Sequence, residues 1–121
     1  PEHTEDSVLK LMAKPSFKLF ERLRMEFDNI VYSSGKKCEL VPYFISGHPG
    51  CGMREMQRLA RTPALKGLYM DQVQDFTPTP MTTSSVMFYT GLDPKNLEKV
   101  FVERDLERKK EQKSFFFRRG K

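Results

Sequence analysis

The sequence has few of the residues that cross-link a protein or anchor it in a membrane. It contains two cysteines, Cys38 and Cys51, and no tryptophan. Two cysteines cannot form a disulfide framework, so they predict a reduced protein and a cytoplasmic location. No apolar run approaches the roughly 20 residues that a membrane-spanning helix needs, and we predict no membrane partner. The chain begins at Pro1 without a methionine, from which we expect an excised or processed piece of a protein.

Complete nucleotide-binding and metal-binding motifs are also missing. The G-x-x-x-x-G spacing of a phosphate-binding loop occurs at 47–52, but Met53 and Arg54 stand where that loop needs Lys and Ser or Thr. His48 and Cys51 are three residues apart without the close pair of thiols that is typical of structural zinc sites. We therefore predict no metal ligands, and no Ser, His or carboxylate spacing assigns a catalytic residue.

Segments with the apolar spacing of a helix and segments with that of a strand follow one another along the chain. A nearly continuous apolar run before Gly47 is typical of a strand covered on both faces, which favours a parallel sheet. The alternation predicts an α/β fold with two to three parallel strands and flanking helices. We expect a short helix within 1–15, a helix over 16–35, a strand over 38–46, a helix over 52–60, a strand over 68–76 and a closing helix over 103–117.

Local signals predict how several of these elements begin and end. Thr4 is the expected N-cap of the first helix, and Gly35 the left-handed stop of the second. Pro42 lacks a backbone N–H, so regular strand pairing should begin after it. We interpret Cys38 as a buried strand thiol and Cys51 as the cap of the third helix.

Positive charge is concentrated at the C-terminal end of the chain. The net charge is +5, and the stretch from Glu103 to Lys121 holds eight Lys or Arg against four Asp or Glu. A basic tail can bind nucleic acid or an acidic partner. The acids alternate with the bases here, which favours a solvated helix or flexible tail over nucleic-acid binding.

Three stretches resemble a known family, namely "PEHTEDSVLKLMAKP", "VPYFISGHPGCG" and "DQVQDFTPTPMTTSSVMFYTG". They are similar to the closing half of YgiQ-type proteins, an uncharacterised family of radical S-adenosylmethionine (SAM) enzymes. The resemblance implies a segment of a partial (β/α) barrel over 1–92, followed by a basic tail over 93–121 that starts a further C-terminal region. It also implies that the working face lies at the carboxyl ends of the strands.

The same resemblance implies where the cofactor would bind. Ile45 and Gly47 match part of the fifth-strand G-x-I-x-G pattern that packs on the adenine of SAM in this superfamily. Tyr43 and Gly50 depart from its Gly and Glu. Two further side chains, Phe44 and Gln74, would support that pocket. The rim near SAM or substrate would be formed by Glu2, His3 and His48.

The cysteine motif of the superfamily, C-x-x-x-C-x-x-C, does not occur in this sequence. The resemblance therefore implies a C-terminal fragment of a larger iron–sulfur enzyme, inert alone and with neither SAM nor a 4Fe–4S cluster bound to it. The parent enzyme would cleave SAM reductively to a 5′-deoxyadenosyl radical that attacks an unknown substrate. Its partner would be the remainder of the same polypeptide, and exposed strand edges could self-associate.

An alternative function remains open from the sequence alone. The closing residues "SFFFRRGK" place aromatic side chains beside arginines, a combination that stacks on single-stranded nucleic acid. On this alternative the chain is a non-enzymatic, basic nucleic-acid-binding module, and its affinity for RNA should fall steeply with added salt.

Overall fold

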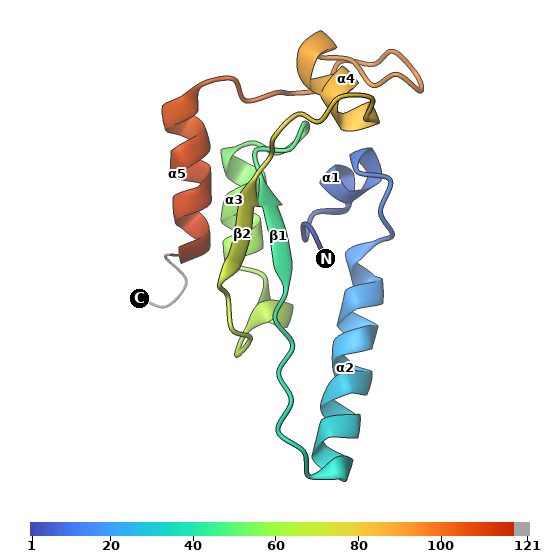
Figure 1. Cartoon of the computed structure of the whole chain (residues 1–121), viewed down its shortest axis with the longest axis vertical. Helices are drawn as coiled ribbons and strands as arrows, with labels where there is room; N and C mark the ends of the chain where they lie inside the picture. The colour runs from blue at the N-terminus through green and yellow to red at the C-terminus, as the bar shows by residue number, and fades with distance from the viewer. Residues whose placement is uncertain (118–121) are drawn as a thin grey trace.

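The protein, described here over residues 1–117 by a computed structural model, is an α/β structure built on a two-stranded parallel sheet (Figure 1). Strand β1 (Tyr43–Ser46) pairs with β2 (Gln72–Asp75), with Tyr43 opposite Gln72 and Ser46 opposite Asp75. The α/β class and the parallel pairing that the sequence predicted are confirmed. The described residues do not form a closed barrel. The helices are α1 (Asp6–Leu11), α2 (Phe17–Ser34), α3 (Met53–Ala60), α4 (Thr83–Thr90) and α5 (Leu106–Phe117), with a 3₁₀ turn η1 (Pro63–Leu65).

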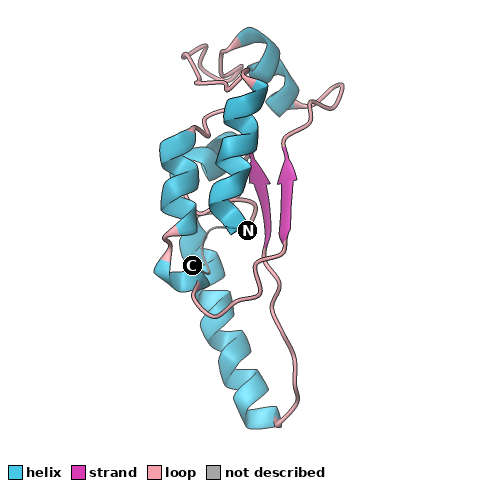
Figure 2. Cartoon of the chain, turned by 90° about the vertical axis from the view of Figure 1, so that its left-hand side faces the viewer, coloured by secondary structure: helices cyan, strands magenta, loops and turns pink. Residues whose placement is uncertain are grey.

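Helices α3 and α5 lie together against one face of the sheet (Figure 2). Phe44 of β1 points to this side, and its ring meets that of Phe116 on α5 with centroids 5.6 Å apart. Met56 and Leu59 lie three residues apart on the inner face of α3, and both are fully buried in the same cluster. The closing helix is therefore packed on the core as far as Phe116.

The second edge of β1 carries the start of the chain. The N–H of Ile45 donates to the carbonyl of Glu2 at 2.9 Å, while on the opposite edge the N–H of Phe76 donates to the carbonyl of Ser46 at 2.7 Å. Backbone groups of successive strand residues point to opposite edges, so these two bonds lie on different sides of β1. β1 is thus the inner strand of this small sheet, with an extended N-terminal segment beside it.

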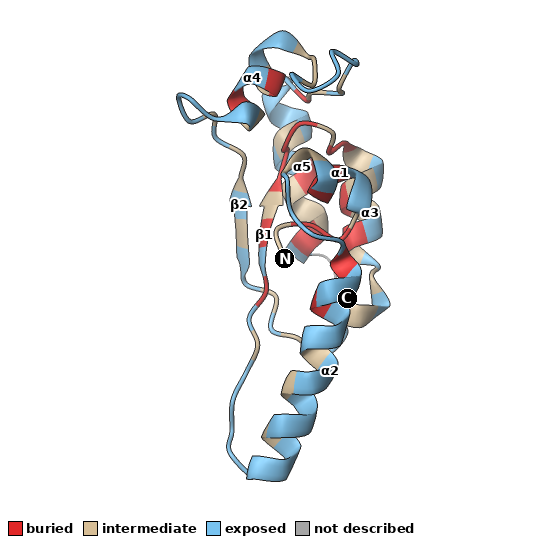
Figure 3. Ribbon diagram, turned by 90° about the vertical axis from the view of Figure 1, so that its right-hand side faces the viewer, coloured by how far each residue is buried: buried red, intermediate tan, exposed pale blue. Residues whose placement is uncertain are grey.

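Helix α2 extends well beyond the core (Figures 1 and 3). Its start is fixed by Asp6, whose carboxylate accepts from the N–H of Phe17 and from the hydroxyl of Ser16, both at 2.8 Å. Of its apolar residues, Phe17 and Phe20 are buried. Further along, Leu23 is 53% and Ile30 is 65% exposed, so most of this amphipathic helix has no protein against its apolar face in the described residues.

Several local predictions are confirmed and three are wrong. Gly35 ends α2 with a left-handed φ of 64°, and the strand begins directly after Pro42. The N-cap of α1 is Glu5 rather than Thr4, whose hydroxyl is buried without a hydrogen-bond partner. Cys51 does not cap α3, because Gly52 occupies that position and the Glu55 side chain accepts from its N–H at 2.8 Å.

The third error concerns Cys38, which is exposed in the connection before β1. The strand is shorter than the predicted range 38–46, because pairing starts only at Tyr43, and Cys38 therefore lies outside it. Across residues 1–117, no helix combines the length and the apolar character that crossing a bilayer demands.

Candidate functional site

A cleft of about 530 Å³ opens at the carboxyl ends of the two strands. We call it the strand-end cleft. Ile45 of β1 and Gln74 of β2 form its floor, and the segment after β2 together with the start of α4 forms one wall. In parallel sheets this edge is the usual place for ligands, because the loops that follow the strands converge there. The cleft is lined by Glu2, Met12, Lys14, Ile45, His48, Gln74, Asp75, Phe76, Thr77, Thr79, Thr82 and Ser84.

Four of the seven residues predicted at a cofactor or substrate site line this cleft, namely Glu2, Ile45, His48 and Gln74. Ile45 and Gln74 are partners across the two strands and so point to the same face. The Tyr43 hydroxyl donates to the Gln74 side-chain oxygen, which fixes the amide at the cleft floor. Their roles in binding a ligand stay predictions.

The other three predicted residues lie elsewhere. Phe44 alternates with Ile45 and points into the core on the opposite face of the sheet. His3 is fully buried behind the cleft. Gly47 has a φ of 70°, and a Cβ there would lie 3.2 Å from the Lys109 side chain. The glycine therefore allows the close approach of α5, independently of any ligand.

Charged side chains around the cleft occur in pairs. The ammonium of Lys14 lies 3.4 Å from the carboxylate of Glu2. Asp75 accepts from the hydroxyl of Ser46 at 2.7 Å and lies 3.5 Å from the ammonium of Lys113 on α5. The cleft thus presents paired charges, an amide and several hydroxyl groups, a lining suited to a polar ligand.

The imidazole of His48 is the most enclosed polar group of the cleft, with a residue exposure of 3%. Its Nδ1 lies 2.8 Å from the carbonyl of Pro49, and its Nε2 lies 2.7 Å from the hydroxyl of Ser84. Phe76 covers the ring, with centroids 5.1 Å apart. Burial lowers the pKa of His48 against opposing effects of the Pro49 carbonyl and the Glu2 charge.

Behind the cleft, three buried polar side chains from distant parts of the chain form one cluster, which we call the His3–Cys51–Gln112 cluster. The N–H of Glu5 donates to His3 Nδ1 at 3.0 Å, so the neutral ring carries its proton on Nε2, which lies 3.3 Å from Cys51 Sγ. Gln112 of α5 donates to the Cys51 carbonyl at 3.3 Å, and its oxygen lies 3.7 Å from the thiol.

Burial keeps this cluster neutral. It lowers the pKa of His3 to about 4, with a smaller contribution from the charge of His48. It raises the pKa of the Cys51 thiol to about 12. A thiol needs its thiolate form to act as a nucleophile or a metal ligand, so Cys51 is a structural residue. No group of three or more His, Cys, Asp or Glu within residues 1–117 could hold a metal ion.

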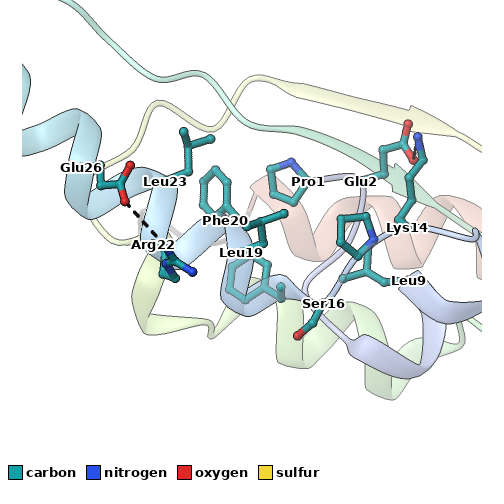
Figure 4. A pocket seen from close by; sticks show the side chains of 12 residues that line it. Pro1, Glu2, Leu9, Lys14, Ser16, Leu19, Phe20, Arg22, Leu23 and Glu26 are labelled. Carbon is teal, nitrogen blue, oxygen red and sulfur yellow. Dashed lines mark ion pairs between the residues drawn. The ribbon is translucent and has the colours of Figure 1, made fainter.

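A second, mainly apolar groove of about 610 Å³ lies between the start of the chain and α2 (Figure 4). Pro1 and Glu2 form one side, and Phe20 and Leu23 of α2 form the other. The groove continues the exposed apolar face of α2 toward the edge of β1 that pairs with Glu2. Its lining combines apolar side chains such as Leu19 and Phe20 with charged ones such as Arg22 and Glu26.

The chain is similar to UPF0313 proteins over almost its whole length. It is 45% identical over 117 residues to such a protein from Bacteroides thetaiotaomicron, covering 97% of this chain and 19% of the relative. A relative from Porphyromonas gingivalis is 44% identical, with 97% of this chain and 18% of the relative covered. A relative from Methanosarcina acetivorans is 43% identical, with 99% of this chain and 16% of the relative covered. The chain thus spans less than a fifth of the length of these relatives.

A family model described as "Domain of unknown function (DUF3362)" matches residues 71–119, from the start of β2 through α5. No solved structure matches the chain.

Sequence reasoning missed Ser84 and Gln112. Ser84 lies in the hydroxyl-rich stretch "MTTSS". Ser and Thr are common at the start of a helix, so this composition does not distinguish a ligand site from a helix cap. Gln112 lies among charged residues that predict a solvated face, yet it is fully buried. The nucleic-acid alternative relied on aromatic and basic residues at the C-terminal end. Of the aromatic ones, Phe116 is enclosed in the core. The basic residues Arg118, Arg119 and Lys121 lie outside the described residues.

Proposed function

We propose that the chain is a C-terminal piece of a radical SAM iron–sulfur enzyme, and that the strand-end cleft is part of its SAM-binding rim. The observation that carries the proposal is the meeting of Ile45 and Gln74 with Glu2 and His48 in one cleft at the carboxyl ends of parallel strands. The similarity to UPF0313 proteins over 97% of the chain supports a place in a larger protein.

The lining of the cleft fits a nucleoside with a polar tail. Ile45 offers an apolar surface for a flat base, while Gln74 and Glu2 offer groups that hydrogen-bond to hydroxyl and amino groups. A volume of about 530 Å³ lies within the usual range for small-molecule sites. When SAM is bound to an iron–sulfur cluster, it supplies a radical that abstracts hydrogen from a substrate.

The cluster itself does not fit this chain. Of the two thiols, Cys51 is buried in its hydrogen-bonded cluster and Cys38 is exposed in a different segment. We propose that the cluster ligands belong to another part of the same polypeptide, with a cytoplasmic parent enzyme. That part would complete a partial (β/α) barrel by covering the apolar groove and the exposed face of α2. Without it, free strand edges would favour self-association.

The first experiment is to determine the natural coding sequence that surrounds these residues. A C-x-x-x-C-x-x-C motif upstream, at a distance of the order of 100 residues or more, is the expected result. A gene that encodes no such motif would contradict the proposal, because SAM cleavage then has no cluster.

A second experiment tests the cleft in the protein that this gene encodes. Gln74 and Gln72 lie two residues apart on β2, yet Gln74 lines the cleft and Gln72 does not. We expect Gln74→Ala to weaken SAM binding about fivefold, the loss of roughly one hydrogen bond. Gln72→Ala should leave the affinity unchanged. Equilibrium dialysis with labelled SAM measures both, and equal affinities for the two variants would argue against this cleft.

A further inference from the structure

The contact between His48 and Ser84 has a defined direction. A carbonyl oxygen only accepts, so the proton that joins His48 to the Pro49 carbonyl at 2.8 Å must sit on Nδ1. The neutral ring then has a lone pair on Nε2, which accepts from the Ser84 hydroxyl at 2.7 Å. A serine oxygen, a neutral imidazole and a carbonyl that orients the ring therefore form a chain of hydrogen bonds, the arrangement of an activated nucleophile.

The surroundings keep His48 in the form that this role needs. Burial lowers its pKa, so the ring is neutral at pH 7 and can accept a proton. Three charged or titratable groups on the elements around it are Glu2, whose charge opposes the shift, His3, which is itself neutral, and Lys109 of α5. The ammonium of Lys109 lies 3.5 Å from the carbonyl of Phe76, the residue whose ring covers His48. Lys14 and Asp75 line the same cleft, and each is paired with an opposite charge.

Ser84 is also placed where a developing negative charge can be stabilised. It is the second residue of α4, is half-buried and lines the strand-end cleft. The N–H groups of Thr83 and Ser84 have no acceptor inside the helix, because the first turn lacks carbonyl partners. Both N–H groups belong to the first turn of α4, at the positive end of the helix dipole.

Capping does not account for the bond between Ser84 and His48. Thr82 already caps α4, since its hydroxyl accepts from the N–H of Ser85. The Ser85 hydroxyl in turn donates to the carbonyl of Thr79 at 2.6 Å. The start of the helix is thus held by Thr82 and Ser85, which leaves the hydroxyl of Ser84 directed at the imidazole and open to the cleft.

We propose that Ser84 and His48 form a nucleophile–base pair that transfers acyl groups from activated esters or thioesters. Ser84 Oγ attacks the carbonyl carbon while its proton moves to His48 Nε2. The bond to the alcohol or thiol leaving group then breaks, and His48 returns the proton to that group. An ester on Ser84 remains, which water hydrolyses with His48 again as base, releasing the carboxylic acid. This activity requires neither SAM nor a metal ion.

The probe is p-nitrophenyl acetate, mixed with the 121-residue protein and followed by intact mass and peptide mapping. We expect one acetyl group on Ser84, removable by neutral hydroxylamine as an ester is and a lysine amide is not. Ser84→Ala and His48→Gln should each lower the rate of this labelling at least tenfold. Ser33→Ala removes an exposed hydroxyl far from the cleft, bonded only within α2, and should not change it.

The pH profile separates a base from a structural contact. The labelling rate should rise with pH through a midpoint below 6.5, as His48 loses its proton, and then level off. Equal rates for the wild type and Ser84→Ala, or acetylation confined to hydroxylamine-resistant lysine amides, would overturn the proposal. His48→Gln with an unchanged unfolding temperature and an unchanged rate would overturn it too. SAM affinity is measured separately, so failure here leaves the cofactor proposal standing.

Discussion

Acid should destabilise this protein through the buried imidazole of His3. Its pKa is lowered to about 4 in the folded state from 6.5, the value expected once the chain unfolds. Between these values the unfolded state binds more protons, so folding stability is present at neutral pH and is lost as pH falls from about 6.5 toward about 4. A histidine that gains an acidic partner has a raised pKa in the folded state and shows the opposite pH dependence, because its contribution to stability is lost as pH rises.

The magnitude follows from the two pKa values. Going from about pH 7.5 to about pH 5, the proton uptake of His3 on unfolding should lower the free energy of unfolding by about 2 kcal/mol. Carboxyl groups with lowered pKa values, such as Asp6, lose their contribution at still lower pH. His48 shifts in the same direction as His3 and adds to the fall.

Urea unfolding of the wild type and of His3→Gln at several pH values tests this. The variant keeps an amide near the position of Nε2 but has no group that titrates in this range, so about 2 kcal/mol of the pH dependence should disappear. His48→Gln is the matched control, because it removes the share that belongs to His48 and leaves most of the share of His3, whose pKa is lowered mainly by burial. If His3→Gln shows the full wild-type fall between about pH 7.5 and about pH 5, then His3 is not buried in neutral form.

Two further predictions concern the loop after β1 and an exposed thiol. Cys38 should react with a disulfide reagent such as Ellman's in the native protein, while Cys51 should react only after denaturation, since burial raises its pKa to about 12; two fast native thiols by mass spectrometry would contradict this. Gly50→Ala should destabilise the protein by about 1–3 kcal/mol, because φ is 86° and the new methyl would overlap Leu11. Gly91 also has a positive φ, 70°, but open space where a methyl would lie, so Gly91→Ala should lower the free energy of unfolding by only about 1 kcal/mol. Thermal unfolding of both variants measures the difference, and equal losses of stability would rule out the clash with Leu11.

The sequence predicted the elements of the fold better than their surroundings. The parallel pair was predictable because an apolar run of strand residues, separated by a helix from the next strand, permits little else. Helical spacing predicted α2 and its end at Gly35. It could not predict that Leu23 and Ile30 would be exposed, since a periodic pattern identifies the apolar face of a helix and says nothing of what covers it.

The cleft was predictable in part for a similar reason. Ile45 and Gln74 follow from the strand ends, where the resemblance and the topology point to the same edge. Phe44 is the neighbour of Ile45, and alternation along a strand turns it to the other face. His3 and Cys51 are 48 residues apart, and neither residue type nor local spacing indicates that they meet. The partnership of His48 and Ser84 was hidden in the same way, by a separation of 36 residues.

The His3–Cys51–Gln112 cluster connects the stability of the fold to the geometry of the cleft. His3 follows Glu2, which lines one wall, and Cys51 follows the His48 segment, which lines another. Gln112 ties both to α5, the helix that also brings Lys113 to Asp75. Protonation of His3 would place a charge beside a thiol and an amide that have no counter-charge, so the two walls should loosen together. The acid that unfolds the protein should therefore also disturb the cleft.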